Sequence, residues 1–167
     1  MKIGVFVEEN YEDLEFWYPK IRLEEAGFKV VAIGPTAGHP YKGRHGYPCV
    51  ADVAFSEAAG IAFDALVIPG GFAPDRLRRS PYVLHMVKEI FSRGKPVAFI
   101  CHGGWVPISA KILKGKKVTG AAAIKDDLEN AGGIWQDTPV VVDGNLISSR
   151  SPLDLPFFTK AILAQLE

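Results

Sequence analysis

Short apolar runs alternate along the chain with segments of helical period, and this alternation constrains the fold more than any other feature. Residues 2–7 and 28–33 are β-rich runs. The segment between them has the spacing of a helix with Leu14, Tyr18 and Ile21 on one side. A strand–helix–strand unit of this length implies two parallel strands. We therefore expect a parallel sheet flanked by helices.

The rest of the chain continues this pattern. We expect two further buried strands, at residues 65–68 and 96–100, with a helix between them at residues 82–93. A helix is expected to run on from the second strand, from residue 101 to about 114. Further helices are expected among short strands at residues 125–130 and at the end of the chain at residues 152–166. Residues 38–53 lack helical period and are predicted to form a hairpin or loop. Asp143-Gly144-Asn145 is a strong hairpin turn between apolar runs. The prediction is one domain over residues 1–167: a doubly wound α/β fold, mostly parallel, with helices on both faces, of flavodoxin-like type.

Charge and apolar content exclude several classes of protein. Nineteen basic and nineteen acidic residues leave no net charge, which argues against a nucleic-acid binder and against an anionic membrane as partner. The longest apolar runs are too short for a transmembrane helix or for the core of a signal peptide. We therefore expect a cytoplasmic protein. In a reducing compartment Cys49 and Cys101 are expected to be free thiols, and no Cys/His cluster has zinc spacing. No metal and no cofactor is expected.

Ligands of doubly wound folds bind at the carboxyl ends of the strands, where Cys101 lies. A nucleophile on a sharp strand-to-helix turn points into the crevice, and a helix N-terminus stabilises the reactive thiolate. Gly103 and Gly104 allow a tight turn and close approach of a substrate. A free cysteine is by default buried and inert, so the local sequence leaves both interpretations open for Cys101. Cys49 has no such setting and is expected to be structural.

A glycine pair follows the strand at residues 65–68. Gly70 and Gly71 can direct backbone N–H groups at a developing oxyanion, although a plain turn is the better explanation of the pair taken alone. The pair lacks the spacing of a dinucleotide fingerprint. His45 either lines the pocket of a neighbouring subunit or is a surface loop residue. The arginines at 76, 78 and 79 are interpreted as a solvated helix face or subunit contact.

Six segments, in this order, carry a resemblance to a known family: Glu12-Asp13-Leu14-Glu15 with Tyr18-Pro19, Gly43-Arg44-His45-Gly46-Tyr47, the run from Asp64 to Gly71, the run from Lys95 to Gly103, Ile124-Lys125-Asp126-Asp127 and Ser148-Ser149-Arg150. The chain resembles the PfpI-type intracellular proteases, within the superfamily of parkinsonism-associated deglycases and class I glutamine amidotransferase-like proteins. The resemblance covers essentially all 167 residues.

The resemblance implies an active site. It assigns the nucleophile to Cys101, the adjacent histidine to His102 and the N-terminal active-site glutamate to Glu15. It makes the backbone N–H groups of Gly71 and His102 the oxyanion donors. In the family's oligomers an acidic residue of a neighbouring subunit pairs with that histidine, and the matching position is Asp75. The chain is therefore expected to form a homo-oligomer, a dimer or a hexamer.

Four positions depart from the family pattern. Gly104 and Trp105 follow Cys-His-Gly where protease-like members carry proline and a polar residue. Asp75 replaces the longer glutamate. Ala121 stands where a tyrosine often lines the pocket, so we expect a pocket that is wider there, with Trp105 filling part of it.

The proposed residues can be tested against simple electrostatics. Glu15 beside Cys101 cannot easily be ionised together with the thiolate, because like charges in contact raise one pKa strongly. A protonated Glu15 donating to the thiolate is the favourable state, and the titration belongs to the pair. His102 follows Cys101 directly, and sequence neighbours on a helix do not face each other. It can act only through the geometry of the turn.

Three functions remain open. The first is a cysteine hydrolase of the intracellular protease type, in which Cys101 attacks a peptide carbonyl. The second is a cofactor-independent glyoxalase or deglycase, in which Cys101 forms a hemithioacetal with methylglyoxal or glyoxal, or releases a glycated amine. The third is a non-catalytic redox sensor or chaperone. The fold alone does not choose between them.

Overall fold

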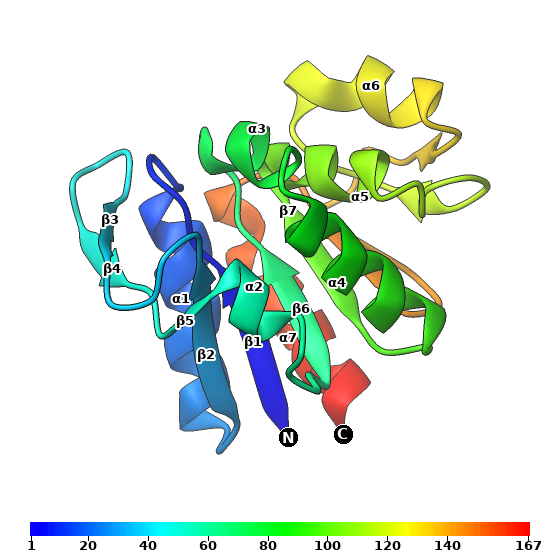
Figure 1. Ribbon diagram of the computed structural model, residues 1–167. Coiled ribbons are helices and arrows are strands. Elements are labelled where there is room, and N and C mark those ends of the chain that lie inside the picture. Colours follow the sequence, from blue (N-terminus) through cyan, green and yellow to red (C-terminus); the bar gives the residue numbers. More distant parts are fainter.

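The computed structural model describes all residues, 1–167, and its centre is a seven-stranded sheet (Figure 1). The strand order is β10-β11-β7-β6-β1-β2-β5, and every pair is parallel except β10 with β11. The strands are β1 (Lys2–Phe6), β2 (Lys29–Gly34), β5 (Val53–Ala54), β6 (Ala65–Ile68), β7 (Val97–Ile100), β10 (Val140–Asp143) and β11 (Leu146–Ser149). The predicted mostly parallel α/β sheet is confirmed.

Helices cover both faces of this sheet. In Figure 1, α1 and α7 lie behind the sheet, whereas α2 and α4 lie in front of it. The helices are α1 (Asp13–Glu25), α2 (Phe55–Ala58), α3 (Ala73–Leu77), α4 (Pro81–Ser92), α5 (Trp105–Ser109), α6 (Lys125–Asn130) and α7 (Leu155–Leu166), with short 3₁₀ turns η1 (Cys101–Gly104), η2 (Ala122–Ile124) and η3 (Pro152–Asp154). No helix combines the length and apolar character that are needed to cross a membrane.

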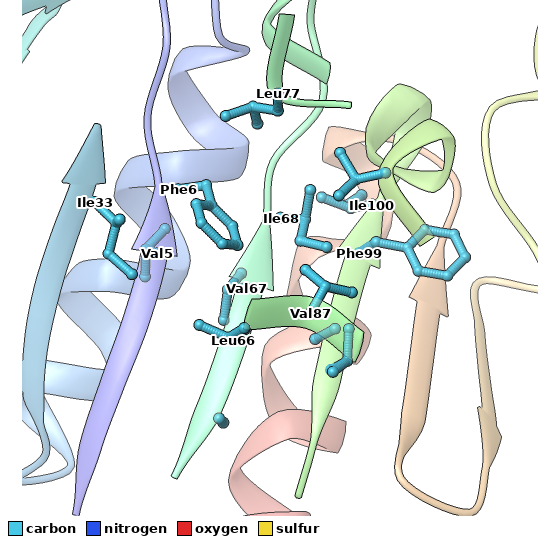
Figure 2. Close-up of a cluster of buried hydrophobic side chains, with 14 of the residues drawn as sticks. Val5, Phe6, Ile33, Leu66, Val67, Ile68, Leu77, Val87, Phe99 and Ile100 are labelled. Atoms are coloured by element: carbon cyan, nitrogen blue, oxygen red, sulfur yellow. The ribbon is translucent and has the colours of Figure 1, made fainter. Parts of the chain in front are cut away.

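The strands of the central sheet carry the core. All four residues of β6 and all four of β7 are buried, because helices cover both faces of a parallel sheet. Figure 2 shows Phe6, Ile68 and Phe99 among the apolar side chains that these strands bring together. This double burial explains why the strands appear in the sequence as unbroken apolar runs. It also holds rigid the strand ends from which the site is built.

The side of helix α1 that packs against the sheet is not the side on which the sequence spaces its apolar residues. Leu14 and Ile21 are each 58% exposed, and Tyr18 is 40% exposed. The buried side is formed by Asp13, Glu15, Phe16, Pro19 and Leu23. A carboxyl side chain is therefore carried into the interior.

The helix predicted from residue 101 to about 114 is shorter than expected. Residues 101–104 form a 3₁₀ turn, and the α-helix ends at Ser109. Lys111 has a φ of 61°, in the left-handed region, and this conformation cannot continue a right-handed helix. The chain then turns into β8 (Lys117–Val118), which pairs in parallel with β9 (Ile134–Trp135).

The segment at residues 38–53 contains the predicted hairpin. Strand β3 (Pro40–Lys42) pairs antiparallel with β4 (Pro48–Val50). Both oxygens of the Asp13 carboxylate accept backbone N–H bonds across the turn, from His45 and Tyr47, each at 2.9 Å. These two bonds hold the hairpin against the start of α1, next to the carboxyl ends of the strands.

Candidate active site

Cys101 lies where β7 ends, on a sharp turn into α5. Its φ is 59°, a left-handed conformation that is costly for any residue other than glycine. Gly103 makes the turn possible, because a Cβ atom at this position would lie 2.6 Å from the carbonyl oxygen of Ile68 on the neighbouring strand. The predicted strand-to-helix elbow at Cys101 is therefore present. It projects the thiol toward the carboxyl ends of the strands.

The turn brings His102 to the thiol despite the two residues being neighbours in sequence. The Nδ1 atom of His102 lies 3.3 Å from Cys101 Sγ. The imidazole packs edge-on against the Trp105 ring, with the ring centroids 5.2 Å apart. The indole Nε1–H of Trp105 in turn donates to Asp127 Oδ2 at 2.9 Å. His102 is thus held between the Cys101 thiol and the Trp105 ring.

Helix α1 supplies Glu15, which is completely buried. Its Oε2 atom accepts a hydrogen bond from the N–H of Gly70 at 2.7 Å. The Cys101 thiol lies near enough to influence the pKa of this carboxyl group, and the Oε1 atom is buried without a hydrogen-bond partner. Gly70 has to lack a side chain, because a Cβ atom would lie 2.5 Å from Glu15 Oε2 and 2.8 Å from Cys101 Cβ. Glu15 and Cys101 thus both border Gly70, and a role for the pair in catalysis stays a prediction.

The backbone N–H groups of Gly71 and His102 both lower the pKa of Cys101, so they favour its thiolate. Gly71 has a φ of 78°, and a Cβ atom there would lie 2.5 Å from the backbone nitrogen of Glu12. A glycine is therefore needed both for the turn and for the close approach of the two chain segments. The N–H groups of Gly71 and His102 are those that the resemblance assigns as oxyanion donors, and that role stays a prediction.

Burial opposes the ionisation of both acidic groups of the pair. Burial raises the pKa of Glu15, and the N–H of Gly70 lowers it in part. Burial also raises the pKa of Cys101, and a negative charge on Glu15 raises it further, whereas the N–H groups of His102 and Gly71 lower it. When the pair carries one negative charge, the thiolate has these two N–H donors. A Glu15 carboxylate would have only that of Gly70, so we expect the protonated carboxyl to donate to the thiolate.

His102 is kept neutral by its surroundings. Burial lowers the pKa of His102 below its ordinary value, and the positive charge of Arg44 lowers it further, while Asp127 acts in the opposite direction. No carboxylate oxygen lies within 4.0 Å of either ring nitrogen in the same chain. A neutral imidazole beside the thiol can accept a proton during a reaction.

Asp75 does not reach this site within its own chain. Its side chain on α3 is 59% exposed and pairs with Arg79 at 3.0 Å. The pairing of Asp75 with His102 of a neighbouring subunit stays a prediction. Trp105 does reach the site, through its contact with His102.

Two residues of the site were not singled out by the sequence analysis. Arg44, on the β3–β4 hairpin, lies 3.6 Å from Glu12 and stacks over Phe72, with its Cζ atom 5.3 Å from the ring centroid. Its charge reaches both His102 and Glu15. Asp127 holds Trp105. Both residues belong to segments that carried the family resemblance, but no spacing rule connects a hairpin arginine with a cysteine far along the chain.

One group of residues has the donor atoms of a metal site. Ligand atoms of Glu12, Asp13 and His45 lie within 4.8 Å of one another. The Asp13 oxygens, however, are taken by hairpin N–H groups, and Glu12 pairs with Arg44 and with His45 at 3.5 Å. These contacts explain the cluster as the anchor of the hairpin.

The raised pKa of Glu15 predicts a pH-dependent stability. In a Cys101→Ala background, where the thiol no longer titrates, the folded chain keeps Glu15 protonated up to about pH 8, whereas the unfolded chain releases that proton near 4.5. The folded state then binds more protons between these values, so the free energy of unfolding falls as pH rises.

Adding Glu15→Gln to this background is expected to remove that fall. The double variant should become more stable than the single variant by on the order of 3 kcal/mol at pH 8, and no more stable at pH 4. Urea denaturation at a series of pH values measures this. Parallel curves for the two proteins across the whole range would show that the Glu15 pKa is ordinary.

Comparison with known proteins shows the family of this chain. The profile of the DJ-1/PfpI family matches residues 1–165. The chain is 46% identical over 155 residues to deglycase PfpI of Pyrococcus furiosus, with 93% of each chain covered. It is 44% identical over 162 residues to YraA of Bacillus subtilis, which is provisionally named a cysteine protease, with 97% and 96% covered.

A solved structure from Anabaena variabilis has the same fold, with a TM-score of 0.96 and 47% identity. The match covers 99% of this chain and 48% of that one, which contains a DJ-1/ThiJ/PfpI-like domain and a ferritin-like domain. The profile match covers nearly the whole sequence, and the two relatives are well above 40% identical to it. The chain therefore belongs to the DJ-1/PfpI family.

Proposed function

We propose that the protein is a deglycase that uses Cys101 to release amines from their adducts with small dicarbonyl aldehydes such as methylglyoxal. Relatives named deglycase share 46% of their residues with the chain. A hydrolase acting on peptides is the competing function, because YraA carries a cysteine protease name. The two reactions place different demands on the groups around the thiol.

The observation that favours the deglycase is the contrast between Glu15 and His102. A peptidase needs a histidine that is held by a third group, so that it can protonate the leaving amine of a stable amide. One chain supplies no carboxylate for His102, so a peptidase would depend entirely on a group from another subunit. Addition of a thiol to an aldehyde carbon needs less, namely a thiolate and a proton donor. The buried carboxyl of Glu15 meets that need at the sulfur.

The proposed reaction balances without a cofactor. In a hemiaminal adduct, the bond between the amine nitrogen and the former aldehyde carbon breaks, the amine leaves with the thiol proton, and Cys101 Sγ bonds to that carbon, which gives a hemithioacetal. A base then moves the proton of that carbon to the neighbouring carbonyl carbon, and the hydroxyl proton moves to the neighbouring oxygen, which converts the hemithioacetal into a thioester. Water cleaves the thioester and restores the thiol. The sum is adduct plus water to amine plus lactate, and neutral His102, 3.3 Å from the sulfur, is the base that we propose.

A paired assay tests this proposal. Wild-type protein is given a preformed methylglyoxal–amine adduct, free methylglyoxal or a fluorogenic peptide, with Cys101→Ala protein as the control for spontaneous breakdown. We expect lactate and free amine above the control from the adduct, and no cleavage of the peptide. Lactate from free methylglyoxal alone would reduce the function to that of a glyoxalase. Cysteine-dependent peptide cleavage without lactate would replace the proposal with a peptidase, and no turnover at all would favour the redox sensor or chaperone.

We also propose that the active unit is a homo-oligomer in which Asp75 of one subunit orients His102 of another. The exposure of Asp75 and the absence of a carboxylate at His102 within one chain support this. A symmetric interface would form the pair twice.

Asp75→Ala is then expected to lower turnover by about 10-fold to 100-fold, because a positioned proton-transfer group contributes about 10²–10⁴-fold. Folding should change little, since the side chain is exposed. Mixing Asp75→Ala chains with Cys101→Ala chains should restore part of the activity after subunit exchange. A fully active monomer in light scattering would contradict the shared site.

A further inference from the structure

A cavity of about 510 Å³ opens between the ends of α3, α5 and α6, apart from the cysteine. Figure 1 shows these three helices gathered at one end of the sheet. Its walls carry three cations and two other polar groups: Arg78, Lys111, Lys114, Asp127 and Asn130. Three positive charges against one negative charge give the cavity a positive potential, although the chain as a whole has no net charge.

None of these three cations has a carboxylate partner within 4.0 Å. The Nε–H of Arg78 donates to Ser109 Oγ at 2.9 Å, and its guanidinium lies over the Trp105 ring, 5.5 Å from the centroid. These two contacts fix the orientation of the arginine and leave its terminal N–H groups without an ion pair. A guanidinium group that is held in one orientation can donate two parallel hydrogen bonds to the oxygens of a phosphate or carboxylate.

The backbone at Lys111 gives a second, independent indication. Its φ of 61° is a conformation in which a residue with a side chain costs about 1–2 kcal/mol relative to glycine or asparagine. The turn itself does not require lysine. Lys111 and Lys114 also line an adjoining cavity of about 360 Å³, together with Lys88 and Lys116. Of these four lysines only Lys116 has an ion-pair partner, Asp143 at 3.8 Å. A charged side chain is thus kept on a strained turn between two basic cavities.

We propose that the cavity between α3, α5 and α6 binds the phosphate group of a small phosphorylated molecule. Arg78, Lys111 and Lys114 would hold the phosphate oxygens. Asp127 and Asn130 offer an acceptor and an amide to hydroxyl groups on the rest of the ligand. The Asp127 carboxylate disfavours a continuous polyphosphate chain such as a nucleic-acid backbone, because it would face further negative charge.

The ligand would lie close to the active site without touching the thiol. Trp105 connects the two places, since Arg78 stacks on its ring and His102 packs against the same ring at 5.2 Å. Binding is measurable without turnover, so its outcome is independent of the proposed deglycase reaction.

Isothermal titration calorimetry at constant ionic strength tests the site, with ribose 5-phosphate, inorganic phosphate and ribose as probes. We expect ribose 5-phosphate to bind more tightly than inorganic phosphate, and ribose not to bind. Lys114→Gln and Lys111→Gly should each weaken binding by about tenfold, the order of one hydrogen bond to a charged group. Lys160→Gln, an exposed lysine on α7 without an ion pair, is the matched control and should bind like wild type.

Lys111→Gly separates binding from folding. Its melting temperature should equal or exceed that of wild type, because glycine relieves the left-handed backbone, while its affinity falls. The proposal is overturned if ribose 5-phosphate gives no binding heat at millimolar concentration, or if Lys160→Gln loses as much affinity as Lys114→Gln. Tighter binding of a duplex oligonucleotide than of ribose 5-phosphate would also overturn it, in favour of a nucleic-acid surface.

Discussion

Replacing Cys101 by serine is expected to lower turnover of the adduct by about 10⁴-fold or more, the scale on which the loss of a covalent nucleophile acts. A serine hydroxyl ionises far less readily than a thiol, and the protonated Glu15 beside it cannot serve as the base that would activate it. His102 would remain in place, but it would have to take a proton from a hydroxyl group, which is a much weaker acid than a thiol. Initial rates of lactate release at saturating adduct measure the effect.

The other cysteine provides the control. Cys49 is buried on β4, its thiol contacts the Val50 carbonyl oxygen at 3.5 Å, and burial raises its pKa to about 12. Cys49→Ser should therefore keep turnover per folded molecule within about twofold of wild type, because a buried thiol with a raised pKa stays protonated and unreactive. If Cys49→Ser lost as much activity as Cys101→Ser, the assignment of the nucleophile would be wrong.

Gly70→Ala is expected to cost more than about 10²-fold in kcat/KM, since a misplacement of about 1 Å at reacting groups can have that effect. The new methyl group would lie 2.5 Å from Glu15 Oε2 and 2.8 Å from Cys101 Cβ, so one of the two must move. Glu15 is completely buried, so its side chain can move only if the surrounding interior repacks. Overpacking of this kind also lowers the free energy of unfolding, by about 1–3 kcal/mol.

Gly60→Ala is the matched substitution. Gly60 has no positive φ, and a Cβ atom there would meet only the Glu57 carbonyl oxygen, at an ordinary 3.6 Å. It should leave kcat/KM unchanged and raise or preserve the melting temperature. Wild-type kcat/KM in Gly70→Ala would mean that the contact between Glu15 and Cys101 is not needed for the reaction.

The sheet and the elbow could be predicted because their signals are local. Strands buried on both faces leave unbroken apolar runs, and β6 and β7 are such runs. Cys101 follows one of them directly, and the glycines after it mark the turn. The two residues that complete the site, Glu15 and Gly70, come from segments that the fold brings together, and only the family resemblance connected Glu15 with the cysteine.

Two features had no usable signal. Apolar spacing showed that α1 is a helix but could not show which side faces the sheet, because a buried carboxyl shares the inner side with Phe16 and Leu23. The end of α5 was missed because left-handed residues are usually glycine or asparagine, and here the residue is Lys111.

The two edges of the sheet bear on how the protein avoids aggregation. One edge strand, β5, is two residues long, and the other, β10, is an antiparallel strand of four residues that follows Pro139. At the end of β10, Asp143 accepts the N–H of Lys117 at 2.8 Å, which ties a neighbouring segment to that corner. Two short edge strands, one of them preceded by proline, offer little unpaired backbone for strand addition by another chain. Growth of the central sheet by a strand of a second copy is therefore disfavoured while the sheet stays folded.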